Sequence, residues 1–360
     1  MKVLQIHAGP KALAHIKANG LQPQDIAVIP GAAGGPKGLI LGPLDRYLFD
    51  QWLPRSQQPV DLVGASIGAW RLATACLPHP RSELQALEEA YVHQDYPLSP
   101  GQKRPTPQQV SETFEANLQD FYGGRIHHVL QHPRYRLHVM TSHGLGVLHR
   151  ASPLRTALGY AGAYLTNAVS RRAMGHWLER VVFSSPFMGH PQPLPFRVLD
   201  YRTRQVALSE HNFLQAVLAS CSIPFVLKAV DGIAGAPSGA YWDGGITDYH
   251  LHLDYRGAKG LTLYPHFQAH VVPGWLDKKL SWRHKTTPYL DTTIVLCPHP
   301  DWVKKLPNHK LPDRSDFITY QGRLSERVKV WKQAIAEAGR LADEWAEWLH
   351  RPNPDQVEAL

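Results

Sequence analysis

Short hydrophobic runs alternate with polar and glycine-rich stretches over the first quarter of the chain. The runs that predict buried strands lie at residues 3–8, 25–29 and 60–63. The helices predicted between them lie at residues 11–18, after the glycine-rich stretch to about residue 52, and at about 69–76. This alternation predicts an α/β fold with a mostly parallel central sheet and helices on both faces. In such a fold the functional loops follow the carboxyl ends of the strands.

The middle of the chain has a less regular pattern. Residues 77–107 are rich in proline and predict a connecting loop around one helix at about 83–93. Strands are predicted at residues 135–140 and 196–208. The second stretch could also form a hairpin that turns at Arg202-Thr203. Ser209 is placed to cap a helix that runs to about Ser220. We therefore expect one α/β domain over residues 1–310, with a large mixed insertion at about 77–240.

The clearest amphipathic helix is predicted at residues 315–349. Its apolar positions recur at intervals of three or four, at Leu324, Val328, Trp331, Ile335, Ala338, Leu341 and Trp345. Such a helix can lie on a bilayer, with Arg323, Arg327, Lys329 and Lys332 near the headgroups, or pack on its own domain. Because acidic residues dilute the basic face, we expect residues 311–360 to form a helical extension packed on the domain.

Composition narrows the class of protein. Hydrophobic residues make up 43% of the chain and charged residues 19%, as in ordinary globular proteins rather than disordered ones. No apolar run approaches the length of a membrane span, and the first residues lack the features of a signal peptide. The three cysteines, Cys76, Cys221 and Cys297, are far apart and are expected to be inert packing residues in a reducing compartment. We therefore expect a cytoplasmic protein.

The charge balance points to anionic partners. The net charge is +8 at pH 7, from 38 basic and 30 acidic residues. Such a surface favours nucleic acid or an anionic membrane. Because the chain lacks finger spacing and RNA-binding motifs, we expect no nucleic-acid partner, and peripheral contact with an anionic membrane stays open.

A candidate nucleophile lies between the third predicted strand and the helix after it. Gly64-Ala65-Ser66-Ile67-Gly68 matches G-x-S-x-G, in which small residues on both sides of the serine allow a sharp turn. The turn presents the hydroxyl at a helix N-terminus, where amides favour developing negative charge. A purely structural turn is the alternative.

The glycine-rich stretch from Gly31 to Gly38 admits three interpretations. A phosphate-binding Walker loop is excluded because Pro36 precedes Lys37 and Gly38 replaces the Ser/Thr that binds Mg²⁺. A dinucleotide loop is excluded by the glycine spacing. An oxyanion hole fits, because consecutive glycines after a buried strand expose backbone N–H groups.

A candidate base comes much later in the sequence. Asp243 is followed by Gly244 and Gly245, which permit a tight turn, whereas Asp231-Gly232 is expected to be an ordinary turn. His250 and His252 would share one face of a strand and offer a metal-site option, but no third ligand is fixed by spacing. His127, His128 and His143 are expected to be surface or hydrogen-bonded polar residues.

These three elements together resemble the patatin-like phospholipase family. The family's G-G-x-[RK]-G, G-x-S-x-G and D-G-[GA] motifs match Gly34-Gly35-Pro36-Lys37-Gly38, Gly64 to Gly68, and Asp243-Gly244-Gly245. Residues 219–224 resemble the family's A-S-x-x-x-P block, and the resemblance spans about residues 26–249. It departs at Ala33, where many members have glycine, at Pro43, and in the absence of an Asn-Pro pair after Gly245.

The resemblance implies a three-layer patatin-like fold and a lipid acyl hydrolase. Ser66 would be the nucleophile, Asp243 its base, and the loop amides at Gly34 and Gly35 the core of the oxyanion hole. The substrate would be a phospholipid, lysophospholipid or other acyl-ester lipid, and no metal or organic cofactor would be needed. Two alternatives remain open: an α/β-hydrolase with a Ser-His-Asp triad, and a non-catalytic lipid- or nucleotide-binding module.

Overall fold

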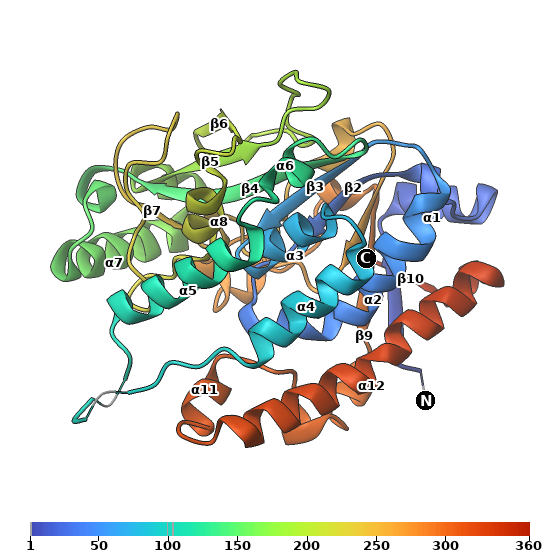
Figure 1. Cartoon of the computed structure of the whole chain (residues 1–360). Helices are drawn as coiled ribbons and strands as arrows, with labels where there is room; N and C mark the ends of the chain where they lie inside the picture. Colours follow the sequence, from blue (N-terminus) through green and yellow to red (C-terminus); the bar gives the residue numbers. More distant parts are fainter. Residues whose placement is uncertain (1, 99, 103) are drawn as a thin grey trace.

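The fold is built around one mixed sheet of ten strands (Figure 1). The computed structural model describes residues 2–98, 100–102 and 104–360. The strands are β1 (Leu4–Ala8), β2 (Ile26–Gly31), β3 (Val60–Ala65), β4 (Tyr135–Gly144), β5 (Leu178–Ser184), β6 (Thr203–Ala207), β7 (Tyr241–Asp243), β8 (Leu261–Pro265), β9 (Thr293–Pro298) and β10 (Val357–Ala359). Their order is β10-β1-β9-β8-β2-β3-β4-β5-β6, and β7 pairs with β4. Most neighbours are parallel, whereas β1–β9, β4–β5 and β4–β7 are antiparallel.

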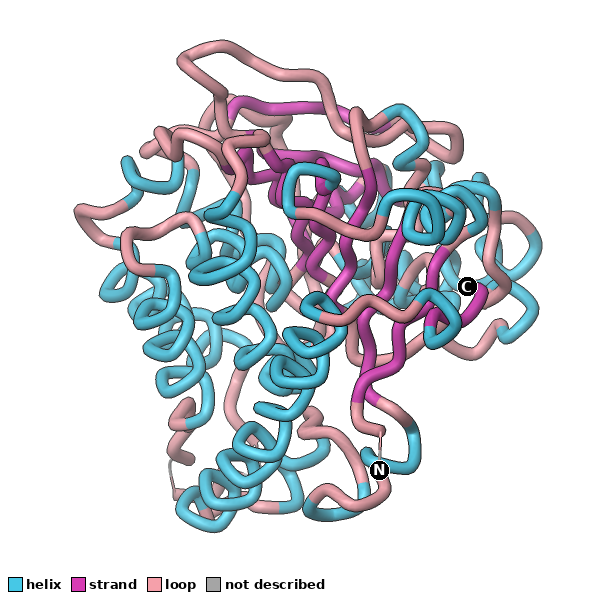
Figure 2. The backbone as a smooth tube through the Cα atoms, turned by 90° about the vertical axis from the view of Figure 1, so that its right-hand side faces the viewer, coloured by secondary structure: helices cyan, strands magenta, loops and turns pink. Residues whose placement is uncertain are grey.

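The longer helices gather mainly on one face of this sheet (Figure 2). The helices are α1 (Pro10–Asn19), α2 (Gly42–Tyr47), α3 (Ile67–Ala75), α4 (Pro80–Val92), α5 (Pro107–Tyr122), α6 (Ile126–Leu130), α7 (Pro153–Val169), α8 (Phe213–Cys221), α9 (Gly245–Asp248), α10 (Pro300–Val303), α11 (Ser315–Thr319) and α12 (Leu324–His350). Helix α3 packs on β2, β3 and β4, and α8 packs on β4 and β7. Helix α4 packs on α3 and α5 packs on α8, while α2 and α12 pack on α4 and on each other. An α/β fold with a mostly parallel sheet is therefore observed, as the sequence predicts.

The second face of the central strands is covered differently from the prediction. Val28, Val63 and Met140 are buried there against Tyr249 and Val272. These covering residues come from irregular segments and short helical turns, because proline and glycine recur between residues 186 and 290 and interrupt helices. Helices on both faces were expected, and over these central strands the longer helices lie on one face.

Several elements begin or end elsewhere than predicted. Only residues 203–207 of the expected strand 196–208 enter the sheet, because Arg197 makes a single bridge to Asp254 instead of a ladder. Helix α8 begins at Phe213 after Asn212, not at Ser209. The expected helix 315–349 is divided into α11 and α12, with Gly322 at a φ of 71° between them.

The register of the sheet brings three turns to one edge. Gly31 at the end of β2 pairs with Gly64 of β3, so the glycine-rich loop and the serine turn leave the sheet side by side. Asp243 at the end of β7 pairs with Thr141 of β4, the strand next to β3. The predicted loop, nucleophile and base are therefore neighbours in space.

Helix α12 packs on the protein through its apolar stripe. Trp331, Ala338, Leu341 and Trp345 are buried, and the ring of Trp345 meets that of Trp52 edge to face at 6.0 Å. The stripe is thus occupied by α2, β1 and neighbouring residues and is not free for a bilayer. Among the described residues, no helix combines the length and apolarity that crossing a membrane requires.

We predict that Trp345→Ala lowers the free energy of unfolding by about 3–5 kcal/mol, because it leaves a cavity between α12 and Trp52. Denaturant unfolding followed by circular dichroism measures the change. Trp282→Ala is the matched control, since that indole is 59% exposed and should cost far less. Equal effects of the two substitutions would contradict the packing argument.

Candidate active site

Ser66 occupies a strained turn between β3 and α3. Its φ of 55° and ψ of −129° are rare for a residue with a side chain. The flanking glycines make the turn possible, since a Cβ on Gly64 would lie 2.4 Å from Ala69 Cα and one on Gly68 would lie 1.8 Å from the Gly31 oxygen. Ala65 and Ile67 are buried on either side. The turn thus holds the hydroxyl at the N-terminus of α3.

Ser66 and Asp243 form a direct pair although 177 residues separate them in sequence. The Ser66 hydroxyl donates to Asp243 Oδ2 at 2.8 Å, and both residues are buried. The other carboxylate oxygen, Oδ1, accepts the amide of Gly245 at 2.7 Å. A Cβ on Gly244 would lie 2.1 Å from the Met140 oxygen, so this turn also needs glycine. The carboxylate is therefore fixed toward the hydroxyl at both of its oxygens.

The surroundings of Asp243 make it a stronger base than an exposed aspartate. Burial raises the pKa of its carboxyl, whereas Arg314, the hydrogen bond from Ser66 and the amide of Gly245 act in the opposite direction. The net shift is upward. A carboxylate with a raised pKa accepts a serine proton more readily than an ordinary one.

Ser220 connects the nucleophile turn to the sheet, a role that the sequence did not indicate. Its hydroxyl accepts the backbone amide of Ser66 at 2.9 Å and donates to the Met140 oxygen at 2.7 Å. The backbone oxygens of Ser220 and Ser222 accept the amides of Gly244 and Asp243. The resemblance marked residues 219–224 as a motif, and the structure shows that this block ties the serine turn to the aspartate turn.

The glycine-rich loop lies beside this pair. Gly35 has a φ of 56° and begins a 3₁₀ helix (Gly35–Leu41). Within the described residues, the amides of Gly34 and Gly35 donate to no other group, whereas the Ala33 amide donates to the Tyr249 oxygen. These two amides are thus available to an oxyanion.

The rest of the predicted oxyanion motif has other roles. Pro36 has no N–H to donate to an oxyanion, and it stands in the first turn of the 3₁₀ helix. Gly38 is buried within that helix, where a Cβ would press on the Ile67 side chain at 3.2 Å. The Lys37 ammonium lies 5.2 Å from the centre of the Phe267 ring.

Two cavities adjoin at the Ser66–Asp243 pair. The large cavity, of about 750 Å³, contains Ser66 and is mainly apolar, with Trp70, Tyr91, Phe114, Leu227 and Phe317 in its wall. The small cavity, of about 320 Å³, contains Asp243, Gly34 and three cationic residues, Lys37, Lys278 and Arg314. Ile223 and Arg314 line both cavities, so a ligand could extend from one into the other across the pair.

The cations of the small cavity outnumber its acidic groups. Burial, Lys37 and Arg314 lower the pKa of Lys278 to about 8, against the opposing effect of Asp243. Burial likewise lowers the pKa of Lys37. The other carboxylate in the wall, Asp313, is already paired with Lys310 at 2.8 Å. Lys278 and Arg314 lie beyond residue 260, and no sequence motif marked them.

The predicted histidine sites lie outside the Ser66–Asp243 pair. His143 is buried, with Nδ1 2.9 Å from Glu179 and Nε2 2.9 Å from the Ser238 oxygen. The strand expected around His250 and His252 is absent, because Leu251 between them has a φ of 49°. In the described residues, no group of three or more His, Cys, Asp or Glu could hold a metal ion.

The cysteines and the second aspartate are placed as follows. Cys76, Cys221 and Cys297 are buried and unpaired, and burial raises the pKa of each thiol, so they remain largely protonated at neutral pH. Asp231 is exposed and lines neither cavity.

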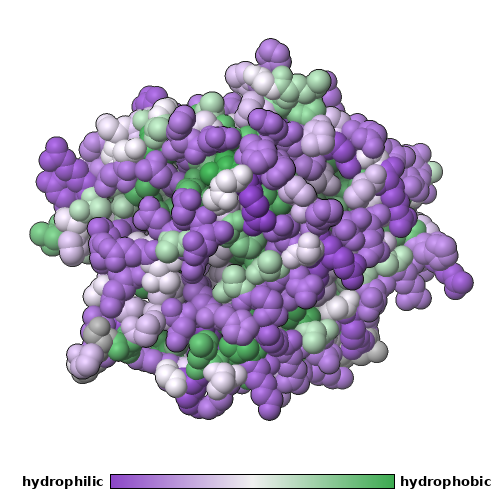
Figure 3. All heavy atoms as spheres, viewed as in Figure 1, coloured by the Kyte–Doolittle hydropathy of each residue, from purple (hydrophilic) through white to green (hydrophobic). Residues whose placement is uncertain are grey.

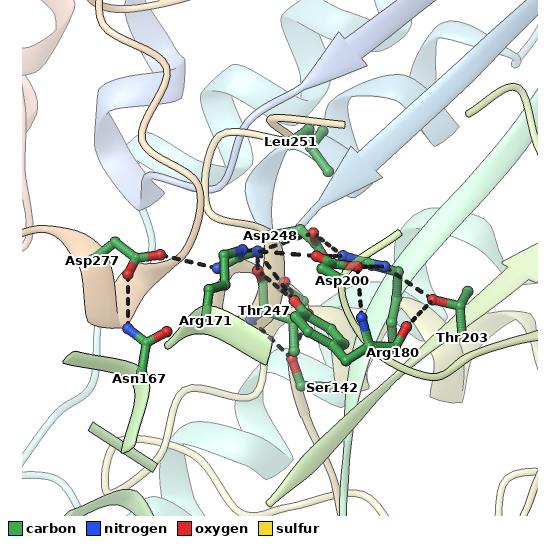
Figure 4. Close-up of polar contacts among 12 residues, drawn as sticks. Ser142, Asn167, Arg171, Arg180, Asp200, Thr203, Thr247, Asp248, Leu251 and Asp277 are labelled. Atoms are coloured by element: carbon green, nitrogen blue, oxygen red, sulfur yellow. Dashed lines mark hydrogen bonds and ion pairs between the residues drawn. The ribbon is translucent and has the colours of Figure 1, made fainter. Parts of the chain in front are cut away.

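A buried charge network lies behind the aspartate turn (Figure 4). Arg180 of β5 is fully buried and donates to both oxygens of Asp248 in α9, at 2.7 and 2.6 Å. Arg171 lies between Asp248 and Asp277, at 3.7 and 2.9 Å. Asp277 ends the 3₁₀ turn Trp275–Asp277 and precedes Lys278. The network therefore anchors the segments that follow Asp243 and carry Lys278.

In comparisons with known proteins, neither a protein-family model nor a curated protein matches the chain.

Proposed function

We propose that the chain is a lipid acyl ester hydrolase of the patatin-like type, with Ser66 and Asp243 as its catalytic dyad. The observation that carries the proposal is the 2.8 Å hydrogen bond from the Ser66 hydroxyl to Asp243 in a strained strand-to-helix turn. The free amides of Gly34 and Gly35 beside that turn support the same reaction. Patatin-like phospholipases are the family that the sequence motifs resemble.

The proposed reaction has two steps. The Ser66 oxygen attacks the ester carbonyl while its proton passes to Asp243, and the amides of Gly34 and Gly35 stabilise the oxyanion. The intermediate collapses to an acyl-enzyme, and the leaving alcohol takes the proton from Asp243. Asp243 then takes a proton from a water molecule, whose oxygen attacks the acyl carbonyl. As the bond to the Ser66 oxygen breaks, Asp243 returns that proton to this oxygen, and the fatty acid leaves. Apart from water, every group that takes part in these steps belongs to the chain. We therefore expect that the reaction requires no cofactor and that the enzyme stays active in EDTA.

The two cavities support a lipid with an anionic headgroup. The apolar wall of the large cavity around Ser66 suits an acyl chain. The cations of the small cavity suit a phosphate on the alcohol side of the ester. A phospholipid or lysophospholipid from the cytoplasmic leaflet of a membrane would bind with its acyl chain in the large cavity and its phosphate in the small one. Its ester would then lie between the two cavities, at the dyad.

The alternatives make different demands on the same site. A Ser-His-Asp triad would need an imidazole between serine and carboxylate, but the Ser66 hydroxyl is bonded to Asp243 directly. A binding module would not react with a fluorophosphonate probe, whereas an activated serine would. The probe therefore separates a hydrolase from a non-catalytic protein.

We predict that Ser66→Ala reduces ester turnover by about 10⁴-fold or more and abolishes fluorophosphonate labelling. The variant should fold, because alanine places the same Cβ in the turn. Ser222→Ala removes another buried hydroxyl, bonded to the Leu218 oxygen, and should keep its labelling. Full labelling of Ser66→Ala would place the nucleophile elsewhere.

We predict that Asp243→Asn reduces kcat/KM by about 10³-fold or more, because the amide cannot accept the serine proton. In the wild type, the rate should fall with decreasing pH as Asp243 becomes protonated, at a pH above the usual aspartate value of about 3.9 because burial raises this pKa. A pH profile of kcat/KM measures both effects. Asp231→Asn, His143→Gln, His250→Gln and His252→Gln should keep the profile. A histidine variant as inactive as Ser66→Ala, with active Asp243→Asn, would favour the triad.

We predict that Lys278→Gln and Arg314→Gln raise KM by about tenfold for an acyl glycerol phosphate, but not for the matched neutral monoacylglycerol. For the wild type, KM for the phosphate ester should also rise above about pH 8, where Lys278 loses its charge. Lys259→Gln, which changes an exposed lysine outside both cavities, is the control. Equal KM changes for both substrates would contradict a role of Lys278 and Arg314 in binding the headgroup phosphate. They would not contradict the proposed hydrolase activity.

A further inference from the structure

Helix α7 lies at one end of the molecule (Figure 1). One face of this helix is apolar and exposed to solvent. Leu154, Leu158, Leu165 and Val169 are exposed by 70%, 59%, 66% and 88%. Their spacing places them on one side of the helix, whereas the other side buries residues such as Tyr160 and Ala163. Figure 3 shows hydrophobic residues at the left edge, where Figure 1 places α7. A row of exposed leucines is unusual on a soluble surface and marks a contact site.

The two chain segments that form and flank this face carry basic residues but no acidic ones. Residues 144–178 and 278–290 contain no aspartate or glutamate. The exposed cations of these two segments are Arg150, Arg155, Arg172, Lys278, Lys279 and Lys285, and none of them forms an ion pair within the described residues. A partner for the α7 face must therefore supply negative charge as well as apolar surface.

An exposed tryptophan lies on a turn that is hydrogen-bonded to the end of α7. Trp282 is 59% exposed on the 3₁₀ turn Ser281–Arg283. The next residue, Arg283, donates to the Asn167 side chain at 3.0 Å and to the Ala168 oxygen at 3.4 Å, which fixes this turn to the end of α7. The neighbouring turn at Trp275 also contacts α7 and lines the small cavity.

We propose that an anionic lipid bilayer binds this docking face, which consists of Leu154, Leu158, Leu165, Val169 and Trp282 with Arg155, Arg172, Lys279 and Lys285. Leucines enter the acyl boundary, tryptophan prefers the headgroup level, and the cations bind lipid phosphates. A second copy of the chain is a poorer partner, because it would bring two sets of unpaired cations together. The purpose of docking rests on the proposed lipid substrate: it would bring the mouth of the small cavity to the membrane.

The test is vesicle sedimentation with Ser66→Ala protein, which prevents turnover from changing the lipid. Vesicles of phosphatidylcholine with phosphatidylglycerol are compared with pure phosphatidylcholine. Binding to the anionic vesicles should exceed binding to the neutral ones and weaken as salt rises past about 0.15 M. Adding Leu158→Gln and Leu165→Gln should weaken binding by about tenfold or more. Adding Arg155→Gln and Arg172→Gln should weaken it by about fivefold per charge.

The matched control is Met188→Gln with Leu199→Gln, two residues that are 84% and 52% exposed outside α7. This control should bind vesicles as well as the parent, and thermal unfolding should show that all variants fold. Unchanged binding by the α7 variants, or equal binding to both vesicle types, would overturn the proposal. A dimer on sedimentation that Leu158→Gln and Leu165→Gln convert to monomer would assign the face to a second copy. Failure of the hydrolase proposal would instead appear as absent ester turnover by the wild type, with vesicle binding unaffected.

Discussion

The site depends on backbones that touch where no side chain can fit. The Gly68 backbone meets that of Gly31 so closely that a Cβ would lie 1.8 Å from the Gly31 oxygen. This contact brings the start of α3 against the end of β2, and therefore Ser66 against the glycine-rich loop. The same kind of contact, of Gly244 with Met140, seats the Asp243 turn on β4. Because glycine stands at each contact, three turns from distant parts of the chain can share one edge of the sheet.

The local part of this arrangement could be predicted from the sequence. Glycines around Ser66 and after Asp243 serve sharp turns, and a turn's requirements lie within a few residues of it. Lys278 and Arg314 could not be predicted, because they reach the small cavity through long irregular connections whose course depends on tertiary packing. The strand at residues 196–208 was overestimated for a related reason: its apolar residues cover a face of the sheet as loop, and no ladder partner pairs with residues 196–202.

The network around Arg180 places charged side chains in the interior of the protein. Removing a guanidinium and a carboxylate from water costs several kcal/mol per ion, and apolar residues of equal volume would often be as stable. The ion pair fixes the orientation of the segment after Asp243. Arg180 donates to both oxygens of Asp248, which lies three residues after Gly245. In the described residues, irregular segments and short turns cover this part of the sheet, and the two hydrogen bonds from Arg180 tie α9 to β5 there. Proton transfer from Ser66 depends on the geometry of its hydrogen bond to Asp243. The desolvation cost of the buried ions is therefore offset by a fixed position of Asp243.

The cations of the small cavity act on the base as well as on a headgroup. Burial raises the pKa of Asp243, while the charge of Arg314 lowers it and so weakens the carboxylate as a base. Under the proposed function, a phosphate bound by Arg314 and Lys278 would neutralise that field. The pKa of Asp243 would then rise toward the value that burial alone favours, and the carboxylate would accept the Ser66 proton more readily. A neutral lipid would leave the opposing field in place. The same two side chains would thus favour anionic lipids twice, by binding the headgroup and by making Asp243 a stronger base once the headgroup is bound.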